Sequence, residues 1–298
     1  MKNINIKIFF YKVLNFFIKK YLSFPTLKFI ISTNNNFVKN LYINFWISLS
    51  RKKNYFYKFF FKANNGVNYK INIDIKKKIE NLNEECLNIL EKNGIIIIEN
   101  ALSENDQSKI IENFNKISIK ENRNLRKNET LLKYFEEFDI NNFSTLKKIS
   151  DFFTSKVYGK VLKTSTEFHI HDALKIPEVI INGDNNFHID RFLPNMKLYY
   201  SPFDINENGA PFCYALGSHK IDNQYINFIK SSKLFTDVDP NAKHFLKDKK
   251  EITCKANSLV VALTNGFHGR KPFLEKTTRK LVFLQYHKSY NKISLLFS

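Results

Sequence analysis

Short apolar runs that alternate with loops dominate the second half of the chain, from about residue 168 onward. Runs of a few residues, rich in β-branched and aromatic side chains, are typical of strands. Short strands that follow one another with loops between them predict a closed or two-sheet β architecture, of which the jelly roll is one. The predicted strands cover residues 178–182, 196–203, 258–264 and 279–286.

Helices are expected ahead of this β region. Residues 74–93 carry apolar side chains at spacings of three and four, which predicts an amphipathic helix. Gly94 stands where a glycine commonly caps a helix C-terminus. Residues 95–98 are four consecutive isoleucines, which predicts a short buried strand.

Two further helices are predicted from local signals. Ser103, followed three residues later by Asp106, resembles a helix N-cap, so a helix is expected from there to about residue 117. A second helix is expected over residues 144–158. Residues 119–142 are polar and charged, and we interpret them as a mobile or substrate-side segment.

The composition predicts a globular protein with a strongly basic surface. The 298 residues are enough for one large domain or two small ones, and a hydrophobic content of 43% is ordinary for a globular fold. The formal charge of +19 comes mainly from lysine, since only six of the 47 basic residues are arginine. Lys, Asn, Ile and Phe are abundant together, as an AT-rich coding sequence would produce. A solvated lysine surface therefore explains the charge better than a specific nucleic-acid partner.

Residues 1–66 form a compositional zone of their own, which predicts a basic, aromatic N-terminal segment ahead of a domain over residues 67–298. A basic amphipathic helix within residues 1–60 can make weak contact with an anionic membrane surface. The alternative, slightly favoured, is a helix that packs on the domain with its lysines outward. Lys7 and Lys12 interrupt the apolar run, so neither a signal peptide nor a membrane span is predicted.

Cysteine usage indicates a reducing compartment. The three cysteines are widely spaced and form no CxxC pair, which argues against a disulfide framework or a zinc ribbon. A cytoplasmic location, including a peripheral position at a membrane, is the expectation.

The residues that point to chemistry begin with His188 and Asp190, which lie two positions apart. On an extended strand such residues project to the same face. His268, in Gly266-Phe267-His268-Gly269, offers a third ligand. Two histidines and one carboxylate on one face of a metal, with open positions opposite, are the ligand set of non-heme Fe(II) oxygenases. A competing, weaker metal candidate is His169-x-His171-Asp172.

The order of motifs resembles the phytanoyl-CoA dioxygenase family over about residues 94–287. His188-x-Asp190 is followed by Asn208-Gly209-Ala210-Pro211, Leu216-Gly217-Ser218-His219-Lys220, His268 and, eleven residues later, Arg279. The resemblance implies a double-stranded β-helix, which is a cupin-like jelly roll. The expected fold class is therefore mainly β with flanking helices. The resemblance also implies that His188, Asp190 and His268 are the catalytic metal ligands.

The same resemblance implies a 2-oxoglutarate site. In the family, the arginine at the position of Arg279 binds the distal carboxylate of 2-oxoglutarate, for which a planar guanidinium is suited. Asn195, Lys197 and Tyr199 lie on one face of the strand after the HxD motif. One of these three is expected to contact the co-substrate, and Lys197 and Tyr199 are the candidates for co-substrate binding. The glycine-serine-histidine turn is interpreted as structural, so His219 is not expected among the metal ligands.

Taken together, the resemblance implies an Fe(II)- and 2-oxoglutarate-dependent dioxygenase that uses O₂ to hydroxylate a small-molecule, lipid or glycan-type substrate. Asp190 favours hydroxylation, because related halogenases replace this carboxylate with a small residue. Arg191 and Arg270, each beside a metal ligand, are expected either to contact an anionic substrate or to lie exposed on the surface. The alternatives are a non-catalytic jelly-roll binding module and a membrane-peripheral protein.

Overall fold

The computed structural model describes residues 40, 44, 76–78, 82–117, 126–127, 131–137, 139–158, 165–173, 187–190, 195–232, 237, 239–274 and 276–285. All elements named below belong to one compact unit, Lys53–Tyr286. Apart from two positions, the predicted N-terminal segment of residues 1–66 lies outside the described residues, so its boundary and its membrane contact stay predictions. Within the described part of the chain, no helix has the length and apolar character needed to span a membrane.

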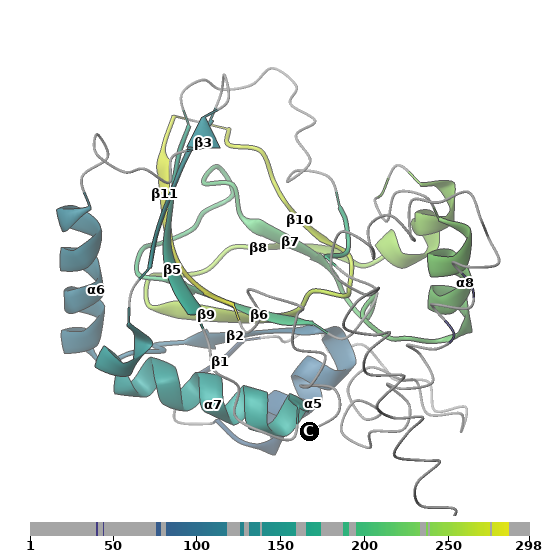
Figure 1. The fold of residues 1–298 in the computed structure, drawn as a ribbon, viewed down its shortest axis with the longest axis horizontal. Coiled ribbons are helices and arrows are strands. Elements are labelled where there is room, and N and C mark those ends of the chain that lie inside the picture. Colours follow the sequence, from purple (N-terminus) through teal and green to yellow (C-terminus); the bar gives the residue numbers. More distant parts are fainter. Residues whose placement is uncertain are drawn as a thin grey trace, which may run out of the picture. The chain divides into compact units, whose positions relative to one another are not determined.

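Two β-sheets form the core of the unit (Figure 1). The large sheet has eight strands in the order β1-β2-β9-β6-β11-β5-β4-β3, and the small sheet has three in the order β10-β7-β8. Neighbouring strands are antiparallel except for β1 and β2. The strands are β1 (Lys76–Lys78), β2 (Ile95–Glu99), β3 (Arg126–Lys127), β4 (Leu131–Glu137), β5 (Ser165–Ala173), β6 (Met196–Ser201), β7 (Phe212–Ala215), β8 (Lys249–Ile252), β9 (Ser258–Leu263), β10 (His268–Arg270) and β11 (Thr278–Gln285).

The chain passes back and forth between these sheets in the manner of a jelly roll. From β5 in the large sheet it reaches His188, which forms a β-bridge with His268 of β10 and so extends the small sheet. It returns to the large sheet in β6, forms β7 and β8 of the small sheet, and then alternates through β9, β10 and β11. This is a double-stranded β-helix. The predicted fold class, mainly β with flanking helices, is confirmed.

Alternation along β6 shows how the sequence assigns the two faces of the large sheet. Met196, Leu198 and Tyr200 are buried, whereas Lys197 and Tyr199 are only half-buried. The Tyr199 ring lies 5.1 Å from the Phe212 ring of β7 in the small sheet, so this second set faces the space between the sheets. Because side chains alternate along a strand, every second residue of β6 faces the interior that carries the candidate site.

An apolar cluster fills the side of that interior where β2 and β9 face β7 and β8. Burial of each large member contributes about 1.5–3 kcal/mol to folding, so this cluster fixes the distance between the sheets. The cluster consists of Ile95, Ile97, Tyr214, Leu216, Ile252, Cys254, Val260 and Ala262.

Helices cover the outer face of the large sheet (Figure 1). The Phe114 ring of α6 packs edge-on against Phe168 of β5, with ring centroids 4.6 Å apart. On the other side of the unit, Phe228 of α8 and Phe245 of η3 pack against Phe267, the residue before His268. The helices are α5 (Glu84–Asn93), α6 (Glu104–Lys116), α7 (Ser144–Tyr158) and α8 (Asn223–Ser231), with 3₁₀ turns η2 (Ile140–Asn142) and η3 (Pro240–Leu246).

Local capping signals predicted several boundaries correctly. The Ser103 side chain accepts a hydrogen bond from the backbone N–H of Asp106 at the start of α6. Gly94 ends α5 in the left-handed conformation, with a φ of 80°. The strands and helices predicted over residues 95–98, 103–117, 144–158, 196–203, 258–264 and 279–286 are confirmed to within two residues at each end. The strand predicted over residues 178–182 lies outside the described residues.

Two predictions were wrong because strand pairing outweighed local pattern. The predicted helix over residues 74–93 begins only at Glu84, where the Asn83 side chain caps it, and Lys76–Lys78 instead pair in parallel with β2. The polar segment predicted over residues 119–142 contains strand β4, which pairs with β5. In both cases the partner strand, β2 or β5, lies outside the short stretch of sequence whose apolar pattern was used for the prediction.

Gly94→Ala should lower the free energy of unfolding by roughly 2–5 kcal/mol, from left-handed backbone strain together with overpacking. An added Cβ would lie 2.4 Å from both the Tyr214 hydroxyl and His219 Nδ1. Chemical denaturation measures the change. Gly209→Ala is the matched control, since its Cβ would approach nothing closer than Asn206 Oδ1 at 3.3 Å. Equal stability of the two variants would contradict this packing analysis.

Candidate metal centre

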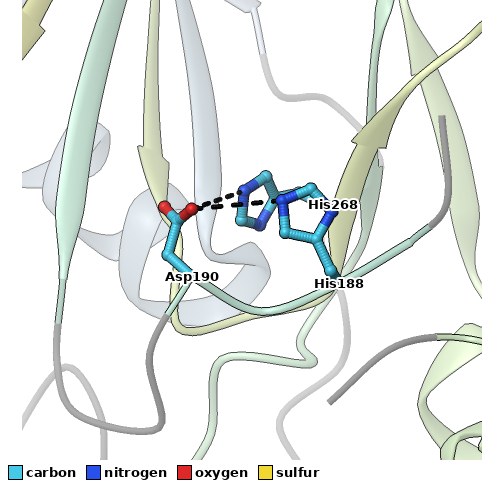
Figure 2. A group of neighbouring side chains, drawn as sticks. All are labelled: His188, Asp190 and His268. Carbon is cyan, nitrogen blue, oxygen red and sulfur yellow. Dashed lines mark ion pairs between the residues drawn. The ribbon is translucent and has the colours of Figure 1, made fainter. Parts of the chain in front are cut away.

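His188, Asp190 and His268 converge on one point between the sheets (Figure 2). One potential ligand atom from each lies within 4.8 Å of the other two. Asp190 Oδ1 lies 3.6 Å from His268 Nε2 and 4.0 Å from His188 Nε2. Within the described residues, this is the one cluster of three such side chains that can hold a metal ion. The structure therefore brings together the three residues that the sequence predicted.

Backbone hydrogen bonds hold the three residues in place. His188 and His268 exchange two N–H···O bonds, of 2.8 and 2.9 Å, which places their rings 4.6 Å apart. The Asp190 N–H donates to the Thr264 carbonyl at 3.0 Å. Two segments that are far apart in the sequence are thus aligned by main-chain pairing rather than by the side chains of the site.

The imidazole of His268 is oriented for ligation. Its Nδ1 lies 2.9 Å from the Gly266 carbonyl oxygen. Because a carbonyl can only accept, Nδ1 carries a hydrogen, so loss of the second ring proton would free the lone pair of Nε2, which faces Asp190, for a metal ion. A second hydrogen bond of this kind fixes the tautomer and ring plane of metal-bound histidines.

Asp190 is held as a carboxylate by its neighbours. Burial acts to raise its pKa, but the charge and hydrogen bonding of His268 and Lys197 oppose burial and hold the pKa well below its usual range. Lys197 Nζ lies 2.7 Å from Asp190 Oδ2, and Asn195 Nδ2 lies 3.5 Å from the same oxygen. Asn195 Nδ2 also donates to Thr264 Oγ1 at 2.8 Å. Asn195 therefore links Asp190 to the loop before His268.

The glycine-serine-histidine turn supports the loop that carries His268. Ser218 Oγ accepts from the Phe267 N–H at 2.8 Å, and the His219 carbonyl accepts from Asn265 at 2.7 Å. The His219 ring is fully buried, with Nε2 3.0 Å from the Glu91 carbonyl of α5. His219 is absent from the metal-ligating cluster, in agreement with the structural role predicted for this turn.

Arg279, Lys197 and Tyr199 face the same interior as the triad. Arg279 is buried at the start of β11, where its guanidinium donates to the Ala210 carbonyl across the two sheets. Burial raises the pKa of Tyr199 well above its ordinary range, the negative charge of Asp190 raises it further, and Arg279 opposes both. The charges of Asp190 and Arg279 therefore both act on the Tyr199 hydroxyl.

A neighbouring pair on β5 belongs to this interior but was not predicted. His169 Nε2 lies 3.0 Å from Glu167 Oε2, and the His169 ring stacks on Phe283 of β11 at 4.6 Å. Phe283 in turn lies 5.2 Å from the Tyr199 ring and beneath Lys197 Nζ, 5.4 Å away. Glu167 and His169 share a face because they lie two apart on β5, but only the pairing of β5 with β11 brings His169 to Phe283.

As far as its side chains are described, the competing metal candidate at residues 169–172 forms no ligand cluster. The rings of His169 and His171 lie 6.1 Å apart on one face of β5. Burial lowers the pKa of His169, which opposes protonation of the ring, while its hydrogen bond to Glu167 acts in the other direction. No metal-ligating group in the described part of the chain includes either histidine.

Of Arg191 and Arg270, the two arginines next to candidate metal ligands in the sequence, the structure describes only Arg270. Arg191 lies outside the described residues. Arg270 is buried, and its guanidinium carbon lies 5.2 Å from the centroid of the Phe273 ring. Exposure at the surface, the alternative for Arg270, is therefore excluded.

These residues fit a divalent metal. Two neutral imidazole nitrogens and one ionised carboxylate oxygen form the donor set typical of non-heme Fe(II) oxygenases. They converge from one extended segment and one strand, with the tautomer of His268 and the charge of Asp190 already suited to ligation.

No protein-family model matches the chain, and no curated protein matches it by sequence. The likeness to the phytanoyl-CoA dioxygenase family therefore stays a prediction. Among solved structures, the chain is similar to SnoK, a non-heme alpha ketoglutarate dependent carbocyclase from nogalamycin biosynthesis, with a TM-score of 0.47 and 13% identity over 69% of this chain and 83% of SnoK.

Two further similarities are to proteins from Streptomyces. For HygX from Streptomyces hygroscopicus, solved with nickel and 2-oxoglutarate bound, the TM-score is 0.42 at 12% identity, covering 68% of this chain and 86% of HygX. For AviO1 from Streptomyces viridochromogenes Tue57, the TM-score is 0.45 at 12% identity, covering 67% and 91%. These likenesses are too distant to assign an activity to this chain.

Thr264→Val should weaken Co(II) binding about tenfold, the lower end of the effect seen when supporting partners of a metal ligand are lost. The change removes the hydroxyl that holds Asn195 beside Asp190. Isothermal titration calorimetry measures the affinity. Thr154→Val in α7 is the matched control, because it also removes a buried hydroxyl hydrogen bond, to the Ser150 carbonyl, far from the triad in the sequence. Equal Co(II) affinity in both variants would exclude a positioning role for Thr264.

Proposed function

We propose that this protein is an Fe(II)- and 2-oxoglutarate-dependent oxygenase that hydroxylates a small-molecule substrate. The observation that carries the proposal is the convergence of His188, Asp190 and His268 within 4.8 Å inside a jelly roll. A metal held by three ligands on one side keeps positions open on the other side for exogenous ligands. A lone HxD motif without the third ligand would not support this function.

The three ligands have distinct tasks in this proposal. Asp190 contributes the negative charge, His268 is aimed by the Gly266 carbonyl, and His188 is held by its backbone bridge to His268. When bound, Fe(II) together with 2-oxoglutarate supplies the O₂-dependent oxidation of a substrate C–H bond. The protein's own contribution is to fix this ligand set and to control what approaches its open side.

Arg279, Lys197 and Tyr199 are proposed to bind 2-oxoglutarate. All three lie on the inner face of the large sheet, and the charge of Arg279 reaches Tyr199. A guanidinium binds a carboxylate through two parallel N–H groups, which suits the distal end of a dicarboxylate. The raised pKa keeps the Tyr199 hydroxyl protonated, so it can donate a hydrogen bond to an anionic ligand.

Aromatic side chains border these residues. Phe212 lies 5.6 Å from the His268 ring and 5.1 Å from Tyr199, and Phe283 stacks on His169 of β5. In such surroundings, charged and hydrogen-bonding contacts act in a low effective dielectric and orient ligands strongly. The polar residues of the interior are therefore suited to position a small, charged co-substrate.

The deciding experiment is anaerobic titration of the metal-free protein with Fe(II) and 2-oxoglutarate, followed by absorbance in the visible charge-transfer region. The wild-type protein should develop a band. His188→Ala should abolish it, because a metal ligand is lost. Arg279→Ala should require roughly tenfold or more 2-oxoglutarate to reach the same absorbance, because a charge-assisted contact contributes about 1.5–3 kcal/mol.

Matched controls separate the site from general effects of substitution. His244→Ala removes an exposed histidine, and Lys280→Ala removes the cation next to Arg279; both should leave the band unchanged. A folded wild-type protein that gives no band would overturn the proposal. It would favour the alternative in which the jelly roll is a non-catalytic binding module.

A further inference from the structure

Lys197 and Asp190 form a short ion pair inside the candidate site. Lys197 Nζ lies 2.7 Å from Asp190 Oδ2, and both side chains are about one-fifth exposed, at 21% and 19%. Asp190 Oδ1, the other oxygen, faces His188 and His268. The Asp190 carboxylate therefore contacts the Lys197 ammonium group through one oxygen and faces the two imidazoles with the other.

The charges of this arrangement change when a divalent cation binds. In the metal-free protein, the ammonium group of Lys197 lies against one oxygen of Asp190, and His268 lies near the other. A cation at Oδ1 adds two positive charges within a few ångströms of the ammonium group. At the low effective dielectric of a half-buried site, such repulsion is substantial. Lys197 thus opposes metal binding for as long as it stays on Asp190.

The Lys197 ammonium group lies beside an aromatic face of the same interior, along which its side chain can turn. Its Nζ lies 5.4 Å from the Phe283 ring centroid, and Tyr199 follows it on the same face of β6. Lysine has a long, flexible stem, so its ammonium group can turn without movement of the strand. A turn along this face carries the ammonium toward the region proposed to hold the carboxylates of the co-substrate.

We propose that Lys197 is a counter-ion that Asp190 and an anionic co-ligand share in turn. It neutralises Asp190 before the metal binds, and it pairs with a carboxylate of the 2-oxo acid afterwards. Lys197 then couples the two binding events, so that each ligand raises the affinity for the other. The identity of the anion rests on the proposed function, whereas the effect on metal binding alone does not.

The test compares wild type, Lys197→Met and Lys197→Arg by calorimetric titration with Co(II), first alone and then in the presence of 2-oxoglutarate. Lys197→Met keeps an unbranched stem and removes the charge. It should bind Co(II) alone about tenfold more tightly than wild type, since a competing cation is gone. It should also bind 2-oxoglutarate to the Co(II)-loaded protein about tenfold more weakly. Lys197→Arg should stay close to wild type in both titrations.

Lys271→Met is the matched control, because it removes a lysine that pairs with Glu251 on the small sheet, 3.0 Å away, and not with the triad. It should change neither affinity. Weaker Co(II) binding in Lys197→Met would overturn the inference and show that Lys197 orients Asp190 for the metal. Unchanged coupling between Co(II) and 2-oxoglutarate in Lys197→Met would also overturn it.

The two proposals fail in different ways. If wild type binds Co(II) but not 2-oxoglutarate, the proposed function fails, and tighter Co(II) binding by Lys197→Met still shows the competition for Asp190. If wild type binds both ligands and Lys197→Met matches it in every titration, the function stands and the counter-ion role is excluded.

Discussion

The pair of backbone hydrogen bonds between His188 and His268 is the interaction on which the candidate site depends. It joins the extended segment after β5 to β10, and so it adds that segment to the small sheet. Because main-chain groups make these bonds, the two imidazoles become neighbours whatever their own chemistry. The Ser218 hydroxyl and the aromatic cluster around Phe267 then hold the second of these segments in place.

Charge inside the protein is organised differently from charge on its surface. The net charge of +19 reflects a large excess of lysine. In the interior, by contrast, Asp190 is paired with Lys197, and Glu167 is hydrogen-bonded to His169. Charges at such half-buried positions interact far more strongly than charges in water. The few interior charges therefore determine what the site can bind, while the surplus of lysines does not identify a partner.

Some features of the fold could be predicted because they are local. Ser103 and Gly94 end helices through hydrogen bonds and backbone conformations that involve only their near neighbours. The four isoleucines of β2 are buried on both faces, and such a run indicates a central strand without further context. Lys76–Lys78 and β4 were missed because their structure comes from pairing with β2 and β5. Three lysines do not favour a strand, and the apolar and aromatic residues of β4 stand in a segment that is otherwise polar.

The sequence by itself determined the identity and order of the residues that can carry chemistry: His188, Asp190, His268 and Arg279, with the turns between them. Strand alternation placed Lys197 and Tyr199 on one face, because a period of two is a property of the backbone. Only the tertiary structure decided which groups meet. The contact of Lys197 with Asp190 joins β6 to the segment before it, the stacking of His169 on Phe283 joins β5 to β11, and Arg279 of β11 reaches the Ala210 carbonyl ahead of β7. Sheet register sets such contacts, and register follows from packing over the whole domain rather than from any short stretch of sequence.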